Sequence, residues 1–240
     1  MNQILVSEKV YVTPKMRRRK VFYKIQFVLS ILIVLGLIIY VINLEYGQHK
    51  GNKTSQTTLK DFEGIDTTVV EEDDVFVVAL NDNTTEVPKD PPKPLEEFNK
   101  VYTTDSGMEY KIDSILSIPA IDIKYPVTSE SNTELLKIAL NKFWGGEPNS
   151  VGNYCIVGHN YDGKDIFFGK LHKLQNGDTV ELTDKTGKKK IYTVYDKYIV
   201  QPNDVACTSQ LTNGRVEATL ITCADGGKTR LIVKCRVLDE

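Results

Sequence analysis

The stretch EATLITCADGGKTRLIVKCRV, residues 217–237, holds two apolar runs on either side of a glycine pair. Both runs are rich in Ile, Val, Leu and Thr, and Gly226-Gly227 is typical of a two-residue hairpin turn. Such a turn sets Cys223 opposite Arg230, and directly opposed residues point to the same face of a sheet. A guanidinium beside a sulfur favours the thiolate and can donate hydrogen bonds to an oxyanion. Taken alone, however, Arg230 is more simply a solvated charge on a strand whose other face is core.

Other short apolar runs in the C-terminal half predict further strands, at residues 115–119, 121–123, 154–157, 179–182 and 191–200. Pro119 indicates a break or an edge after the first of them. Turn signals such as Asn176-Gly177-Asp178 separate the later ones. Many short strands with one or two short helices are typical of a closed β-barrel. We therefore predict a mainly β fold over residues 111–240.

One helix is predicted between residues 132 and 143. Asn132 or Thr133 can cap its first turn, and Gly145-Gly146 can end it. Apolar residues recur between them at helical spacing, namely Leu135, Leu136, Ala139, Leu140 and Phe143.

An uncharged stretch of twenty residues, Ile25 to Leu44, lies near the N-terminus. As a helix it is about 30 Å long, which is the thickness of a bilayer's hydrocarbon core. A cleavable signal peptide is the alternative, but its apolar region is usually about 7–15 residues long and is followed by small residues. We therefore predict a single transmembrane anchor. Seven basic side chains in residues 1–24 predict that this tail is cytoplasmic and that the chain after Leu44 is extracellular.

Residues 45–110 are predicted to be an extracellular acidic linker, which leaves residues 111–240 as the one globular domain. Residues 61–99 hold twelve acidic and two basic side chains. They offer too little apolar surface to offset the entropy of ordering the chain. A solvated spacer is favoured over a partner-binding tail. The apolar run Val75–Leu80 is the exception, with a strand and a docking segment as equal alternatives.

Four cysteines, at positions 155, 207, 223 and 235, lie in this outer domain, where disulfides can form. Two structural bridges are one interpretation. However, Cys155 and Cys235 lie in apolar strands, as small hydrophobic residues do. A domain of about 130 residues is also large enough to have a core without covalent links. Free thiols are therefore favoured, and Cys223, at the end of a strand, is the cysteine that remains to be explained.

Of the three histidines, His159 is the best candidate for a general acid or base. It ends a predicted strand and follows Gly158, so its ring can project from a rim. His49 lies in the predicted linker near the membrane. His172, in Lys170-Leu171-His172-Lys173, is typical of a solvated helical face.

These residues resemble the sortases. The run Thr219-Leu220-Ile221-Thr222-Cys223 is similar to the family's Thr-Leu-x-Thr-Cys signature, with Arg230 at the expected short distance beyond it. Gly158-His159 matches the family's histidine, and the order His, Cys, Arg is the family's order. The resemblance covers about residues 113–239, and the predicted anchor matches the family's single N-terminal span.

The resemblance implies an eight-stranded barrel and a two-step transpeptidation outside a Gram-positive cell. Cys223 would attack the Thr-Gly bond of a Leu-Pro-x-Thr-Gly-like sorting signal and form an acyl-thioester. His159 would move the protons, Arg230 would hold the substrate and steady the oxyanion, and Thr222 would line the substrate pocket. The partners implied are surface proteins that carry the signal and an amine of a cell-wall precursor or another protein, with no nucleic acid. No metal or organic cofactor is required, although some relatives bind calcium.

Two points stay open at this stage. Gly158-His159-Asn160 is similar to the class B pattern, whereas the compact run from Phe168 to Asp178 is more similar to classes A and D. The alternatives to a sortase are an anchored L,D-transpeptidase, whose usual Ser-His-Gly-Cys-like stretch is absent, and a non-catalytic ligand-binding ectodomain with Cys223 buried in a disulfide.

Overall fold

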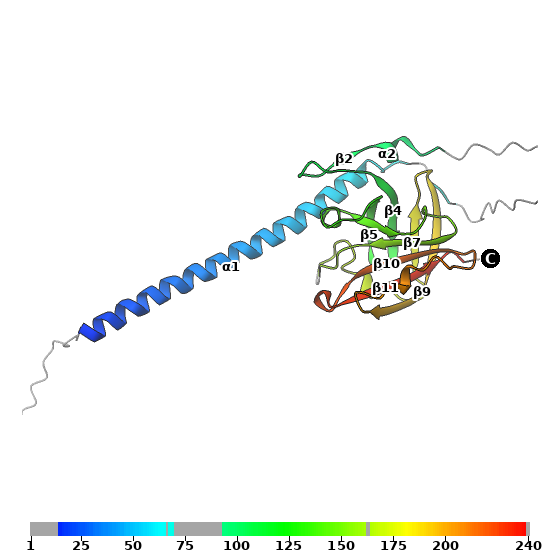
Figure 1. The fold of residues 1–240 in the computed structure, drawn as a ribbon. Helices are drawn as coiled ribbons and strands as arrows, with labels where there is room; N and C mark the ends of the chain where they lie inside the picture. Colours follow the sequence, from blue (N-terminus) through cyan, green and yellow to red (C-terminus); the bar gives the residue numbers. More distant parts are fainter. Residues whose placement is uncertain (1–13, 66, 70–92, 162–163, 239–240) are drawn as a thin grey trace, which may run out of the picture. The chain divides into compact units, whose positions relative to one another are not determined.

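The computed structural model describes residues 14–65, 67–69, 93–161 and 164–238, and Figure 1 shows its ribbon. The chain divides into two compact units, Met1–His49 and Lys50–Glu240.

The first unit holds most of helix α1 (Pro14–Lys60), which includes the predicted span at residues 25–44. Its most apolar window has a mean hydropathy of 2.9, and none of that window is buried. A helix that is apolar on all sides and uncovered by protein is suited to a lipid environment. By length and composition, α1 is therefore sufficient to cross a membrane.

Eight strands of the second unit close into a barrel (Figure 1). Among the described residues they follow the order β9-β11-β10-β7-β6-β5-β4-β8, and β8 pairs again with β9 to close the ring. Only β5–β6 and β7–β10 are parallel in this ring. The predicted mainly β barrel is confirmed. The barrel strands are β4 (Ile112–Ile118), β5 (Ile123–Thr128), β6 (Leu140–Trp144), β7 (Gly152–Val157), β8 (Thr179–Thr183), β9 (Lys188–Val200), β10 (Val216–Ala224) and β11 (Thr229–Arg236).

Alternation along each strand separates the barrel interior from its outer face. In β10, Ala218 and Leu220 belong to the interior core, whereas Ile221 belongs to a separate cluster on the outer face. The interior core also takes side chains from the loop after β7, including Phe167 and Phe168, which are fully buried. The sheet β7-β10-β11-β9 thus has an apolar inner face and a second, partly apolar outer face.

The prediction of a helix between residues 132 and 143 is wrong beyond the first turn. Asn132 caps as predicted, because its Oδ1 accepts hydrogen bonds from the backbone N–H of Glu134 and Leu135. Only the short 3₁₀ turn Leu135–Lys137 follows, and the chain then enters strand β6. Strand β6 pairs with both β5 and β7, so barrel closure overrides the local helical spacing.

Parts of the predicted linker at residues 45–110 pack on the barrel. The end of α1 contributes Leu59, and α2 (Glu96–Asn99) contributes Phe98, to a second cluster of buried apolar side chains that also includes Leu135. Strands β2 (Tyr102–Thr103) and β3 (Glu109–Tyr110) form a small hairpin, and β1 (Thr68–Val69) pairs with β9. A solvated spacer does not account for this packing, because scattered aromatic residues find partners only in the folded domain. Val75–Leu80 lies outside the described residues.

Candidate active site

The β10–β11 hairpin carries two of the predicted site residues. Its register sets Cys223 opposite Arg230, as the sequence predicts. The connecting turn has positive φ at Asp225 (50°), Gly226 (62°) and Gly227 (92°). Glycine adopts such values without steric cost, and Asp tolerates them better than most residues. The glycine pair therefore allows the tight return that brings the arginine beside the cysteine.

Arg230 is half-buried and held against this hairpin. Its Nη1 donates hydrogen bonds to the carbonyl oxygens of Gly227 and Thr229, each at 2.9 Å. These two bonds use the donors of one guanidinium nitrogen only. Nη2 and Nε can therefore still donate to a ligand while the group is kept in a defined orientation.

His159 follows strand β7, which is the parallel neighbour of β10. The last register pair joins Val157 to Ile221, and the N–H of Gly158 donates to the Ile221 carbonyl at 3.1 Å. His159 and Cys223 each come two residues after that pair. Because Ile221 belongs to the outer-face cluster, alternation along β10 directs Cys223 to the same face, and His159 follows the aligned end of β7.

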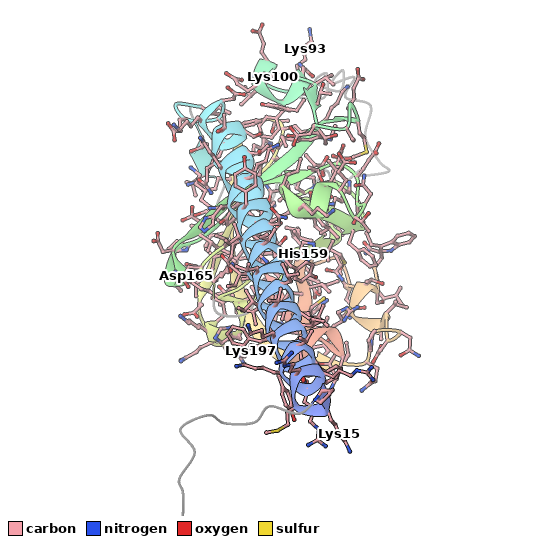
Figure 2. All side chains as sticks on the ribbon, turned by 90° about the vertical axis from the view of Figure 1, so that its left-hand side faces the viewer. Lys15, Lys93, Lys100, His159, Asp165 and Lys197 are labelled. Atoms are coloured by element: carbon pink, nitrogen blue, oxygen red, sulfur yellow. The ribbon has the colours of Figure 1, made fainter. Side chains whose placement is uncertain are left out.

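The structure thus places His159, Cys223 and Arg230 side by side at one end of the barrel. His159 follows β7, Cys223 lies in β10 and Arg230 lies in β11, and these three strands are neighbours. In Figure 2 Lys100, His159 and Lys197 lie at successive heights of the second unit. His159 therefore lies away from Lys100, which belongs to the first part of the second unit. His49 lies in the first unit, and His172 is exposed on a 3₁₀ turn, so neither contributes to this alignment.

Partial burial sets the protonation state of the histidine. Burial lowers the pKa of the His159 imidazole below its ordinary value of 6.5, and the positive charge of Lys137 lowers it further. The ring also lies against Tyr161, with the ring centroids 5.1 Å apart. A lowered pKa leaves the imidazole neutral near pH 7, the form that accepts a proton from a thiol or an ammonium group.

Thr222 is placed differently from its neighbour Cys223. It is only 1% exposed, and its Oγ1 donates a hydrogen bond to the Gly158 carbonyl at 2.8 Å. Gly158 has no room for a side chain, because a Cβ there would lie 2.5 Å from Leu140 and 2.7 Å from Phe168. This burial argues against the substrate contact predicted for Thr222. Its hydroxyl instead links strand β10, which carries Cys223, to the backbone carbonyl directly before His159.

The outer face of the sheet carries a small apolar cluster, which begins at Ile221, two residues before Cys223 in β10. Its buried members are Cys155, Cys207, Ile221 and Ile232. Cys207 comes from the turn Ala206–Thr208 in the loop between β9 and β10.

Three side chains from three strands hold this loop in place. The Cys207 carbonyl accepts hydrogen bonds from Asn153 Nδ2 (2.9 Å), Lys234 Nζ (3.2 Å) and Thr219 Oγ1 (3.3 Å). Lys234 also lies 3.6 Å from Glu217, so its buried charge is paired. The loop therefore forms a fixed wall over the outer face beside the cysteine.

All four cysteines are free, as the sequence favours. Burial raises the pKa of Cys155 to about 12 and raises the pKa values of Cys207 and Cys235 as well, which makes these three thiols poor nucleophiles. Cys223 is the one half-exposed thiol. The disulfide-bonded Cys223 expected for a ligand-binding ectodomain is not present among the described residues.

The sequence did not reveal two features of the site. Asn160 donates from Nδ2 to the Cys223 carbonyl at 2.9 Å, and Lys137 is close enough to influence the histidine. Asn160 follows His159 directly, which was the only available signal; Lys137 lies in the segment predicted to be helical. Within the described ranges no three His, Cys, Asp or Glu side chains are grouped so that they could hold a metal ion.

Comparison with known proteins gives consistent matches to one family. The family model described as Sortase domain matches residues 116–238, about half of the chain. Sortase A of Listeria monocytogenes is 27% identical over 108 residues, which cover 45% of this chain and 47% of that protein. The match thus spans about half the length of this relative. The Bacillus subtilis sortase homologue YwpE is 38% identical over 91 residues, which cover 37% of this chain and 86% of YwpE.

A solved structure gives the same fold. The lid mutant of Sortase A from Corynebacterium diphtheriae aligns with a TM-score of 0.50 and 23% identity, over 57% of this chain and 75% of that one. This likeness supports the closed barrel.

Proposed function

Because this chain belongs to the sortase family of cysteine transpeptidases, we propose that it cleaves a Leu-Pro-x-Thr-Gly-like sorting signal and transfers the released acyl group to an amine. The acceptor is an amine of a cell-wall precursor or of another surface protein. The clients are surface proteins that carry the signal.

The alignment of His159, Cys223 and Arg230 carries this proposal. A nucleophile, a proton carrier and a fixed cation are the three groups that acyl transfer through a thioester needs. Here Arg230 lies opposite Cys223 in the sheet, and His159 follows β7, the parallel neighbour of the strand that carries Cys223. Three side chains therefore supply the whole reaction, and we propose that it requires no metal or organic cofactor.

In the first step the Cys223 thiol gives its proton to the neutral imidazole of His159, and the resulting thiolate attacks the carbonyl carbon of the Thr-Gly bond. The C–S bond forms while the negative charge moves to the carbonyl oxygen, where Arg230 Nη2 or Nε can donate hydrogen bonds. The C–N bond then breaks, and His159 gives a proton to the departing amine. The products are an acyl-thioester on Cys223 and a free glycine amine.

In the second step an incoming amine attacks the thioester carbonyl. The C–N bond forms, the C–S bond breaks, and the sulfur leaves as the thiolate. The attacking nitrogen loses a proton to the neutral imidazole of His159, whose lowered pKa favours the form able to accept it. In this scheme Thr222 is a positioning residue, because its hydroxyl donates to the carbonyl directly before His159.

We further propose that α1 anchors the chain in a membrane through residues 25–44, with the basic residues before it in the cytoplasm. The barrel then lies outside a Gram-positive cell. Tethering raises the local concentration of membrane-bound acceptors near the site.

Mass spectrometry of the full chain in detergent micelles tests the reaction. The chain is incubated with a library of Leu-Pro-x-Thr-Gly peptides, and an acyl adduct that maps to Cys223 and is released by added triglycine is the expected result. Cys223→Ala is the matched control and should form no adduct. Adduct formation on another residue, or full turnover by Cys223→Ala, would refute the proposal.

A further inference from the structure

Asn160 carries an unsatisfied hydrogen-bond acceptor next to the candidate nucleophile. Its Nδ2 donates to the Cys223 carbonyl at 2.9 Å, whereas its Oδ1 is buried and has no hydrogen-bond partner within the described residues. Buried polar atoms in folded proteins are nearly always paired with protein, water or ligand. A donor that approaches this side chain would therefore recover a hydrogen bond that the protein alone does not make.

The same asparagine lines a hollow at the rim of the barrel. The hollow has a volume of about 380 Å³, and Cys223 forms part of its wall. Asp225, His172 and Tyr198 also line it, together with apolar side chains such as Leu231, so one carboxylate, one imidazole and one phenol lie among apolar groups. It differs from the outer-face cluster, whose buried members are Cys155, Cys207, Ile221 and Ile232.

The Asp225 carboxylate has a defined orientation. Thr229 Oγ1 donates a hydrogen bond to Asp225 Oδ2 at 2.9 Å, and the positive φ of Asp225 belongs to the fixed hairpin turn. The one lysine that lines the hollow, Lys197, has its ammonium group bonded to the carbonyl oxygens of His172 (3.0 Å) and Leu174. The exposed Asp225 carboxylate is thus more available to a ligand than the lysine's charge. This favours a cationic donor over an anion.

We propose that this hollow is the binding subsite for the acceptor amine, a primary amine that arrives as its ammonium form. The inference rests on the proposed function. Asp225 attracts and holds the ammonium group, and a small movement of the Asn160 side chain lets its buried Oδ1 accept a hydrogen bond from one ammonium N–H. The apolar side chains contact the carbon atoms attached to the amine.

The position of the hollow fits the second step of the reaction. The ammonium group gives one proton to water and becomes the free amine, and its lone pair then attacks the thioester on Cys223. The C–N bond forms, the C–S bond breaks with the sulfur leaving as the thiolate, and a second proton passes from the nitrogen to His159 as the amide is completed. Water competes for the same thioester, so the subsite determines how the acyl group divides between amine and water.

This division is measured on the full chain in detergent micelles. The chain is charged with a Leu-Pro-x-Thr-Gly peptide, and the amide and acid products are quantified at fixed n-butylamine. Their ratio is a property of the thioester already formed, so it does not depend on how fast the thioester forms. Asp225→Asn should lower the ratio about tenfold, the effect of losing one charge-assisted hydrogen bond. Added salt should lower the ratio of the parent chain but not that of Asp225→Asn, because the ions screen the carboxylate.

Lys228→Gln is the matched control. Lys228 lies in the same hairpin connection but not in the wall of the hollow, so its ratio should equal that of the parent. Asn160→Ala, with its fold checked by circular dichroism, should lower the ratio as well.

An unchanged ratio and an unchanged salt response in Asp225→Asn would overturn the inference. An equal fall in Lys228→Gln would also overturn it, since the effect would then belong to the charge of the loop. If the parent forms no thioester at Cys223, the proposed function itself fails. If the thioester forms but the ratio of amide to acid is the same in Asp225→Asn as in the parent, only the amine subsite is refuted.

Discussion

Replacing Thr222 with valine tests how the site is held together. The substitution keeps the shape of the side chain but removes the hydroxyl that donates to the Gly158 carbonyl at 2.8 Å. Thr222 is 1% exposed, so water cannot easily replace the lost donor. A buried acceptor left without a partner costs about 1–3 kcal/mol. We therefore expect the free energy of unfolding to fall by about 1–2 kcal/mol.

The same loss should affect turnover. The Gly158 carbonyl precedes His159 directly, so the hydrogen bond that is lost also fixes the chain that carries the imidazole. If that free energy is needed to hold His159 in place, kcat should fall about tenfold for about 1.4 kcal/mol. KM should change less, because the Thr222 side chain is only 1% exposed.

Urea denaturation followed by circular dichroism measures the first effect, on the full chain in detergent micelles. At an m-value of about 2 kcal/mol/M, the midpoint should fall by about 0.5–1 M. Thr222→Ser is the control, since it keeps the hydroxyl and should retain most of kcat. The reasoning is refuted if Thr222→Val keeps both the midpoint and kcat of the parent, or if Thr222→Ser loses as much kcat as Thr222→Val.

Three further predictions concern other parts of the molecule. Asp113→Asn should lower the free energy of unfolding by about 3 kcal/mol in urea denaturation, because this 1% exposed carboxylate pairs with two lysines; a change near zero would contradict it. NMR titration should place the pKa of His159 below 6.5, and Lys137→Gln should raise it, because a positive charge is removed; an unchanged or lower value would rule out that cause. Since the folded pKa is lowered, stability from His159 is present above pH 6.5 and is lost as pH falls through the folded pKa. Phe98→Ala should cost about 3–5 kcal/mol, because its ring packs 4.8 Å from that of Phe62; a solvated linker at this position would instead tolerate the change.

The hairpin shows what local sequence patterns can predict. A glycine pair between two β-branched runs was enough to predict that Cys223 lies opposite Arg230, because the register of a hairpin depends only on the turn and on alternation along the strands. The apolar stretch at residues 25–44 likewise needs no tertiary context, since a helix satisfies all its backbone hydrogen bonds internally.

Long-range pairing explains where the sequence was insufficient. The segment after Asn132 has helical spacing, yet residues 140–144 form β6, because the strands before and after it, β5 and β7, need a partner there to close the barrel. The aromatic residues of the predicted linker have no local partner, and only the folded barrel supplies the surface that buries Phe98.

The candidate site divides in the same way. The sequence determined its chemistry, because a cysteine at a strand end, a histidine after a glycine and an arginine beyond a hairpin are local features. Only the tertiary structure decided that Thr222 turns inward to hold the chain before His159, and that Asn160 bonds to the Cys223 carbonyl. These contacts join residues more than sixty positions apart, and no local pattern specifies which strands of a barrel become neighbours.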